Sequence, residues 1–245
     1  MNAHFDFSGR SILVTGASSG IGRTTVERLC ASGARVVAAA RNAAELARLA
    51  QQTGCEPLVL DVGDPGSIDC AFASLGAFDG LVNCAGVALL ERALDTTAAS
   101  FDGVMAVNAR GAALVARYVA RGMIDAGIAG SIVNVSSQAS LVALDDHLGY
   151  CASKAAMDAI TRVLCVELGP HGIRVNSVNP TVTLTPMAVL AWSDPVKREP
   201  ALQGIPLHRF AEPDEVAQPI LFLLSDAASM ISGVALPIDG GYTAR

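Results

Sequence analysis

Short apolar segments alternate with helical patterns along most of the chain, and this alternation constrains the fold more than any other feature. Strands buried on both faces are nearly continuous apolar runs, and parallel strands need a crossover helix between them. The runs are SILVTG (11–16), ARVVAAAR (34–41), PLVLDV (57–62), DGLVNCAG (79–86), GSIVNVSS (130–137) and IRVNSVNP (173–180), with helical patterns over about 20–32, 43–52, 97–126 and 149–168. The alternation predicts an α/β fold with a doubly wound parallel sheet.

The 245 residues are expected to form a single domain. The chain is 51% hydrophobic, only 16% charged and contains 23 glycines, as expected of a sheet covered on both faces with tight turns. No linker, charge block or internal repeat divides it. We predict a single-domain doubly wound (Rossmann) fold over 1–245, with a parallel seven-stranded sheet and helices on both faces. The stretch 181–212 is rich in proline, and a long loop at this edge of the sheet is a candidate substrate lid.

Charge, targeting signals and cysteine spacing exclude several classes of function. The net charge of −6 at pH 7 leaves no basic field for nucleic acid or acidic membranes. The first residues lack a signal-peptide pattern, and no apolar run reaches the roughly 18 residues that span a bilayer, so a cytoplasmic location is expected. Six cysteines without C-x-x-C spacing and four isolated histidines predict reduced thiols and no metal site.

The segment TGASSGIG (15–22) connects the first strand to the first helix, which is the position of a dinucleotide-binding turn. Gly16 permits a tight turn, Gly20 lets the backbone approach a pyrophosphate, and Gly22 allows close packing of helix on strand. The candidate phosphate contacts are Gly16, Ser18, Ser19, Gly20, Ile21 and Gly22. A purely structural turn is the alternative, because the spacing departs from the common G-x-G-x-x-G.

The ends of the second and third strands indicate which dinucleotide binds. An NAD site places an acidic residue after the second strand, whereas this chain has Ala40 followed by Arg41. A guanidinium binds a 2′-phosphate through charge-assisted hydrogen bonds, so Arg41 predicts NADP(H). A solvated arginine at a helix start is the alternative. Asp61 and its neighbour Val62 lie where they would contact the adenine, and a helix cap is the competing role for Asp61.

Tyr150 and Lys154 lie four residues apart in a helical pattern and therefore share a helix face. An ammonium beside a phenol lowers the pKa of the tyrosine and makes it a workable acid or base near neutral pH. Ser137 ends the fifth apolar run, and Asn108 lies in a helical pattern that its helix propensity does not explain. The spacing of Tyr150 and Lys154 alone is compatible with chance, but the four residues together predict a catalytic group.

These motifs together resemble the short-chain dehydrogenase/reductase family. T-G-x-x-x-G-x-G, NCAG (83–86), Asn108, Ser137 and Y-x-x-x-K occur in that family's order over nearly the whole chain. The resemblance implies that Tyr150 donates a proton to the developing alkoxide, and that Lys154 holds the nicotinamide ribose and lowers the tyrosine pKa. It implies that Ser137 binds the substrate oxygen and that Asn108 holds a water. Implied cofactor contacts are Asn83, Ala85, Gly86, Tyr150, Lys154, Thr183 and Thr185.

Two positions depart from the family's pattern. Cys84 stands where the second amide of N-N-A-G is usual, and Thr181 replaces the glycine that usually follows Pro180. Thr181 therefore places a side chain close to the expected nicotinamide pocket.

Longer segments, including VELGPHGIRVNSVNPTV and AWSDP, resemble the L-xylulose reductase (dicarbonyl reductase) branch of the family. That branch implies NADPH-dependent reduction of L-xylulose and small α-dicarbonyls by a homotetramer. Gln138, Leu144, His147 and Trp192, with Ser137 and Tyr150, fall where the branch lines its substrate pocket. Loop structure is the alternative role of His147, and packing or an oligomer contact is that of Trp192.

Other functions compete with this prediction. A 3-oxoacyl-carrier-protein reductase, or another short-chain alcohol or sugar dehydrogenase, shares the catalytic residues, but an acidic carrier needs a basic patch of which this chain shows little sign. A non-catalytic NADP-binding scaffold usually lacks the tyrosine or the lysine, and both are present. A hydrolase triad of Ser137, His147 and Asp145 lacks the G-x-S-x-G turn.

Overall fold

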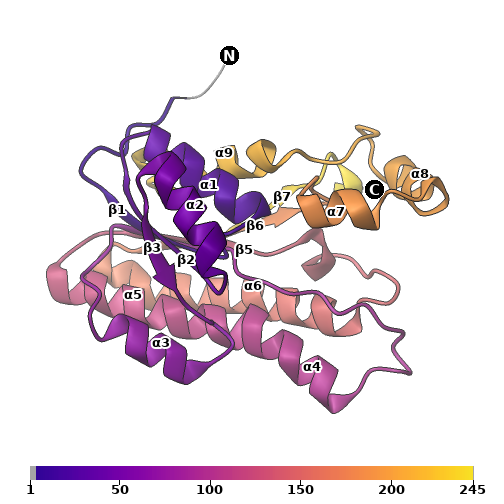
Figure 1. The fold of residues 1–245 in the computed structure, drawn as a ribbon, viewed down its shortest axis with the longest axis horizontal. Coiled ribbons are helices and arrows are strands. Elements are labelled where there is room, and N and C mark those ends of the chain that lie inside the picture. The colour runs from indigo at the N-terminus through magenta and orange to yellow at the C-terminus, as the bar shows by residue number, and fades with distance from the viewer. Residues whose placement is uncertain (1–3, 245) are drawn as a thin grey trace.

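The computed structural model describes residues 4–244, which form a parallel sheet of seven strands (Figure 1). The strands lie in the order β3-β2-β1-β4-β5-β6-β7, and each neighbouring pair is parallel. Their bounds are β1 Ser11–Thr15, β2 Arg35–Ala40, β3 Glu56–Val59, β4 Gly80–Asn83, β5 Ser131–Val135, β6 Arg174–Pro180 and β7 Ala235–Ile238. The predicted doubly wound α/β fold is confirmed.

Helices connect the strands and cover both faces of the sheet (Figure 1). They are α1 Gly20–Ala31, α2 Ala43–Thr53, α3 Pro65–Phe72, α4 Ala98–Met105, α5 Ala112–Ala126, α6 Leu148–Leu168, α7 Pro186–Ala191, α8 Pro195–Gly204 and α9 Pro213–Leu224. A π-helical segment, Ala106–Gly111, joins α4 to α5, and short 3-10 turns occupy Gln138–Ser140, Gly169–His171, Asp226–Ala228 and Tyr242–Ala244.

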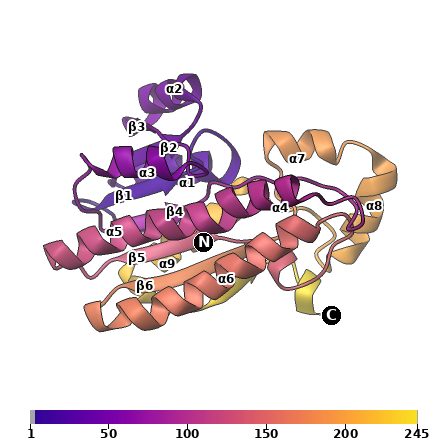
Figure 2. The ribbon, with the colours of Figure 1, turned by 90° about the horizontal axis from the view of Figure 1, so that it is seen from below.

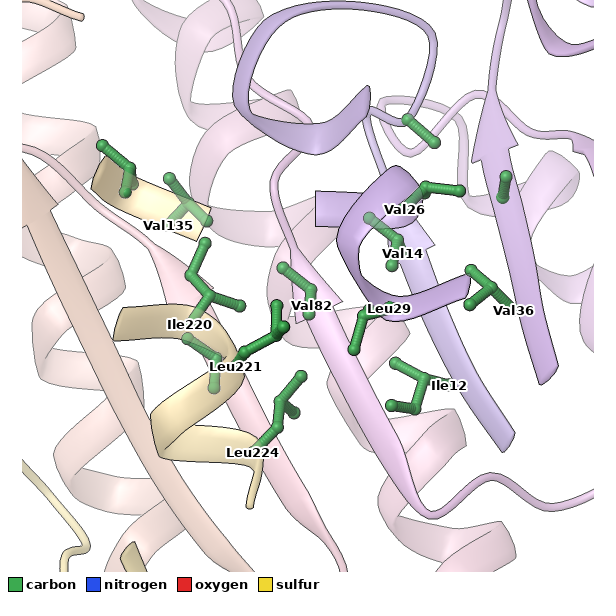
Figure 3. Close-up of a cluster of buried hydrophobic side chains, with 14 of the residues drawn as sticks. Ile12, Val14, Val26, Leu29, Val36, Val82, Val135, Ile220, Leu221 and Leu224 are labelled. Carbon is green, nitrogen blue, oxygen red and sulfur yellow. The ribbon is translucent and has the colours of Figure 1, made fainter. Parts of the chain in front are cut away.

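Strand β1 shows why the apolar runs are nearly continuous. Ile12 and Val14 pack in the layer that includes α1, α2 and α9, whereas Leu13 packs in the opposite layer with α3, α5 and the end of α6. Figure 3 shows the first layer, in which Leu29 of α1 lies beside these strand residues. None of the four side chains is more than 2% exposed. A polar side chain at any of these positions would lose its hydration without gaining a partner.

The structure differs from the sequence prediction in several segments. Strand β3 ends at Val59 instead of 62, so Asp61 and Val62 lie in the following loop. Helix α3 was not predicted, although Asp64 caps it by accepting from the Gly66 N–H (2.9 Å). The stretch 181–212, predicted as a loop, contains α7 and α8. Proline is compatible with the first turn of a helix, where its missing N–H would have no intrahelical acceptor, and both helices begin at a proline.

Among residues 4–244, no helix combines the length and the apolar character needed to cross a membrane. The same range places no three His, Cys, Asp or Glu side chains where they would share a metal ion. The six cysteines are free thiols.

Candidate active site

The strand order brings two turns together at the carboxyl ends of β1 and β4. The chain leaves β1 toward β2 on one side and returns to β4 on the other, and sheets of this kind bind ligands at such a switch point. A Cβ on Gly16 would lie 2.7 Å from the Ala85 nitrogen, so only glycine fits there. The Thr15 hydroxyl holds the turns in place, because it accepts from the N–H groups of Cys84 (3.1 Å) and Ala85 (3.2 Å).

The first turn of α1 lies at the same edge and suits an anion. Gly22 packs against Gly16, whose carbonyl oxygen would be 2.3 Å from a Cβ at position 22. Ser19, the N-cap residue, makes no side-chain capping hydrogen bond, and the first turn carries no acidic residue. The amide dipoles of α1 therefore present positive charge at this edge. Ser18 and Ile21 are half-buried in the same turn.

Arg41 directly follows β2, and its side chain is exposed. Within residues 4–244 it forms no hydrogen bond or ion pair, so its guanidinium is free to bind an anion. Asp61 accepts from the Gly63 N–H (2.9 Å) in its own loop. Because Asp64 caps α3, the competing helix-cap role for Asp61 is wrong. Val62 is buried, and its side chain belongs to the apolar layer beneath this loop.

The Asn83 side chain is directed into the protein. Its amide nitrogen donates to the Ala112 carbonyl (3.1 Å) and to the Asn134 side chain (3.0 Å). Asn134 in turn donates to the Thr161 hydroxyl on α6 (2.8 Å). The Asn83 amide thus ties β4 to β5, α5 and α6. A ligand contact by Asn83 would have to use its backbone.

Tyr150 and Lys154 lie in the first two turns of α6. The Lys154 ammonium donates to the Val135 carbonyl at the end of β5 (2.8 Å) and lies 5.7 Å from the centroid of the Tyr150 ring. A Cβ on Gly86 would lie 3.5 Å from Lys154 Nζ and 3.4 Å from Asn108 Oδ1. The side chains of Lys154 and Asn108 therefore converge on Gly86, where glycine leaves them room.

Asn108 is fully buried in the π-helical segment between α4 and α5. Its Oδ1 accepts from the Val87 N–H (2.8 Å), and its Nδ2 donates to the Val87 carbonyl (2.8 Å) and to the Ser153 hydroxyl (3.0 Å). Ser153 donates to the Tyr150 carbonyl (2.8 Å). The sequence predicted an uninterrupted helix here. Short π-helical segments of this kind occur frequently at functional sites.

The pKa of Tyr150 differs from the sequence expectation. Burial raises the pKa of the phenol, and its interaction with the Ser137 hydroxyl opposes this rise. Lys154 was expected to lower the pKa, but its ammonium is hydrogen-bonded to Val135, and burial has the larger effect. A raised pKa keeps the proton on the phenol at neutral pH.

The charge of Lys154 is sensitive to pH. Burial lowers the pKa of its ammonium to about 8, while Cys84 and Asp158 act in the opposite direction. Burial also raises the pKa of the Cys84 thiol to about 11, so that this thiol is neutral at pH 7. Lys154 is therefore mainly protonated at pH 7 and loses its charge as the pH rises through about 8.

Thr185, after β6, brings the segment 181–212 against the glycine turn. A Cβ on Gly20 would lie 2.7 Å from the Thr185 methyl group, so the two residues are in close contact. The Thr185 hydroxyl accepts from the Ala188 N–H (3.2 Å) near the start of α7. Thr183 donates to the Thr181 carbonyl (3.0 Å). Both threonine hydroxyls are thus engaged within their own segment.

Two buried polar atoms lack a hydrogen-bond partner in the described part of the chain. They are Oε1 of Gln138, the residue after Ser137, and Oγ1 of Thr181, the residue after β6. Buried polar atoms are nearly always paired, so each unpaired one requires an explanation. They follow β5 and β6, two neighbouring strands, and both atoms are closed to solvent, so a ligand could reach them only if neighbouring side chains moved.

His147 lies next to the predicted catalytic tyrosine. Its ring meets the Tyr150 ring edge-on, with centroids 6.1 Å apart and an angle of 68° between the planes. Its Nδ1 contacts the backbone carbonyl of Asp145 instead of the carboxylate. The hydrolase arrangement of Ser137, His147 and Asp145 is therefore not formed.

The other two predicted pocket residues lie in flanking segments. Trp192 follows α7 and packs against Phe210, with ring centroids 5.4 Å apart, so the packing role predicted as its alternative is present. Leu144 is half-buried in the segment before α6. Figure 2 shows α7 and α8 at the end of the molecule where α4 and α6 begin. The segments that carry Trp192 and Leu144 thus lie toward the end of the molecule where α6 begins.

Sequence reasoning missed several residues that shape the site. Ser153 connects Asn108 to Tyr150, and Asp158 and Asn179 belong to a buried network that joins α6 to β6. Ser153 lies within the Y-x-x-x-K motif, so its proximity could have been anticipated. No local pattern marks Asp158 or Asn179, because their contact joins positions that are far apart in the chain.

Comparisons with known proteins agree with this geometry. Residues 16–243 match the family model described as Enoyl-(Acyl carrier protein) reductase. The chain is 50% identical over 238 residues to the L-xylulose reductase of Homo sapiens, covering 97% of this chain and 98% of that protein. It is 48% identical over 243 residues to the D-erythrulose reductase of Gallus gallus, covering 99% of each.

A solved structure described as a short chain dehydrogenase/reductase family protein has the same fold. It has a TM-score of 0.91 and 36% identity, covering 97% of this chain and 99% of that one. The predicted motif order, the full-length relatives and this structural match therefore agree. The chain belongs to the short-chain dehydrogenase/reductase family, and it is an oxidoreductase.

Proposed function

We propose that the protein catalyses the NADPH-dependent reduction of a small ketose or α-dicarbonyl compound. The observation that carries the proposal is the convergence of Tyr150, Lys154 and Asn108 beside the turns that follow β1 and β4. The names of the two relatives support a carbonyl substrate, because L-xylulose and D-erythrulose are both small ketoses.

The residues at this edge fit NADPH. The first turn of α1 has neither a side-chain cap nor an acidic residue, and it would hold the pyrophosphate. Arg41 is exposed and unpaired within residues 4–244, and it would hold the 2′-phosphate. Thr181 lies in the segment that would contact the nicotinamide end. When bound, NADPH supplies the hydride.

Each catalytic residue then has a distinct task. Tyr150 donates its phenolic proton to the carbonyl oxygen, and burial favours this transfer because it keeps the phenol protonated until the more basic alkoxide develops. Ser137, which interacts with the phenol, donates a hydrogen bond to the same oxygen and polarises the carbonyl. The Lys154 ammonium, 5.7 Å from the ring, stabilises the phenolate that remains.

The substrate side combines polar and apolar groups. Gln138 and the His147 ring would bind substrate hydroxyl groups, while Leu144 and Trp192 would cover the carbon chain. The segment 181–212, which contacts the glycine turn through Thr185, would act as the lid.

The competing function is a 3-oxoacyl-carrier-protein reductase, since the family-model description names a reductase of acyl-carrier-protein substrates, although of the enoyl and not the 3-oxoacyl group. The net charge of −6 opposes it, because the carrier is itself acidic.

A substrate panel separates the two functions. NADPH oxidation is followed spectroscopically with L-xylulose, diacetyl and an acetoacetyl thioester, and NADH is tested in parallel. We expect kcat/KM for L-xylulose to exceed that for the thioester by at least about tenfold, since a pocket that pairs substrate hydroxyls rejects analogues without them. Diacetyl, which has no hydroxyl group, tests whether a small dicarbonyl compound is sufficient as a substrate. Turnover of the thioester alone would overturn the ketose proposal.

The pH profile should report the Lys154 charge. Because the pKa of Lys154 is lowered to about 8, its ammonium is present below that pH and is lost as pH rises through it. We expect kcat/KM for the carbonyl substrate to fall on the alkaline side with a midpoint near pH 8. A profile that stays flat up to about pH 10, near the ordinary lysine pKa, would contradict the assigned role.

We also infer a homotetramer in a reducing, cytoplasmic environment. On α6, Val163 and Val166 are 54% and 75% exposed. They are three residues apart and share a helix face, which supports burial of this face against another subunit.

The free cysteines support a reducing compartment.

A further inference from the structure

Asp158 is a buried carboxylate on α6 that has no task in the mechanism described above. It is 4% exposed, and within residues 4–244 it forms no salt bridge. Its Oδ1 accepts from the Ser177 hydroxyl (2.9 Å), and its Oδ2 accepts from the Asn179 amide (2.8 Å), both on β6. Burying a carboxylate costs free energy even when it is hydrogen-bonded, and an apolar residue would satisfy packing alone.

Asn179 extends this network to the turn that carries Ser137. Its amide nitrogen donates to the Ser140 hydroxyl (2.7 Å) and to the Ser137 carbonyl (3.2 Å), in addition to Asp158. Ser140 also donates to the Ser137 carbonyl (2.8 Å), and the Ser137 hydroxyl accepts from the Ala139 N–H (3.1 Å). The backbone that positions the Ser137 hydroxyl is therefore anchored to Asp158.

Asp158 also lies four residues beyond Lys154, one turn farther along the same face of α6. The titratable groups that act on the Lys154 ammonium are Cys84 after β4, Tyr150 on the preceding turn of α6, and Asp158. Cys84 is a neutral thiol at pH 7, and Tyr150 keeps its proton. Of these three groups, Asp158 is the one that carries a negative charge at pH 7. Its carboxylate favours the charged form of Lys154.

We propose that Asp158 is a positioning residue of the active site, which anchors the Ser137 turn through Asn179 and stabilises the positive charge of Lys154. The inference rests on the proposed function, since it concerns the same proton transfer. One side chain on α6 thereby acts on two groups. It fixes the position of the Ser137 hydroxyl, which polarises the substrate, and it supports the charge of the Lys154 ammonium, which stabilises the phenolate.

The test uses Asp158→Asn, which keeps the size of the side chain and removes its charge. The pH profile of kcat/KM with NADPH is measured for this variant and for wild type. We expect kcat at pH 7 to fall about tenfold, and the midpoint of the alkaline limb to move about one pH unit lower, because loss of a nearby opposite charge disfavours the ammonium. NADPH affinity, measured by fluorescence titration at about pH 6, should change less than about threefold, since Lys154 is protonated there in both proteins.

Two further variants separate charge from anchoring. Asp158→Glu retains the charge and should leave the limb midpoint near its wild-type position. Asn179→Ala breaks the link to the Ser137 turn and should lower kcat about tenfold without moving the limb, since a small displacement of a catalytic group is enough for such a loss. Asp125→Asn, which makes the same change at an exposed position of α5, is the matched control and should behave as wild type.

The possible outcomes are distinct. If Asp158→Asn melts at a lower temperature but keeps the wild-type kcat and limb midpoint, Asp158 is merely structural and the proposal is overturned. If Asp158→Asn does not fold, kcat of Asn179→Ala becomes the test. A wild-type kcat in that variant overturns the proposal. Absence of any NADPH-dependent turnover in wild type would instead contradict the proposed function.

Discussion

Replacing Tyr150 by Phe is expected to lower kcat for carbonyl reduction by about a thousandfold, while NADPH affinity changes less than about threefold. The substitution removes only the hydroxyl group that donates the proton. The ring keeps its edge-on contact with His147, so the local packing is preserved. The residues proposed to hold the phosphates, on α1 and after β2, are not altered. The measurements are steady-state kinetics and fluorescence titration with NADPH.

Tyr118→Phe provides the matched control for this experiment. Tyr118 is on α5, where its hydroxyl donates to Asp69 (2.6 Å) away from the site. This variant loses the same group and should retain wild-type kcat. If Tyr150→Phe keeps more than about a tenth of the wild-type kcat, water or another group supplies the proton, and the assignment of Tyr150 as the donor is wrong.

Replacing Arg41 by Asp is expected to reverse the cofactor preference. The variant loses the cation proposed to bind the 2′-phosphate, and it gains a carboxylate that repels this phosphate and accepts from the 2′-hydroxyl of NADH. A charge-assisted hydrogen bond contributes about 1.5–3 kcal/mol, so its loss alone should lower the ratio of kcat/KM for NADPH to that for NADH by about 10- to 150-fold, and the new carboxylate should lower it further. Kinetics with both cofactors at a saturating carbonyl concentration measure this ratio.

Arg121→Asp serves as the control, because Arg121 is an exposed arginine on α5. It makes the same change in net charge and should leave the ratio unaltered. Wild-type protein that already prefers NADH, or an unchanged ratio in Arg41→Asp, would show that Arg41 is only a solvated residue at the start of α2.

Much of the fold follows from local pattern. β1 has the continuous apolar run of a strand covered on both faces, and in the structure Leu13 faces one layer while Ile12 and Val14 face the other. The helix that carries Tyr150 begins within a residue of the predicted boundary. Helix α3 and the helices in 181–212 were harder to predict, because they are short and proline marks a helix start as readily as a loop.

The candidate site could be predicted only in part, as Asn83 and Thr181 illustrate. The motif places Asn83 in the turn after β4, but only the structure shows its amide hydrogen-bonded to Asn134 inside the protein. The replacement of glycine by Thr181 is visible in the sequence, whereas the lack of a partner for its buried hydroxyl is not.

The sequence by itself determined the parallel sheet, the glycine turn after β1 and the shared helix face of Tyr150 and Lys154, because these depend on residues close together in the chain. The tertiary structure alone decided the raised pKa of Tyr150, which results from burial. It also decided the link from Asp158 through Asn179 to the Ser137 turn. The physical reason is that burial and hydrogen-bond partners are set by elements distant in sequence, and local spacing contains no information about them.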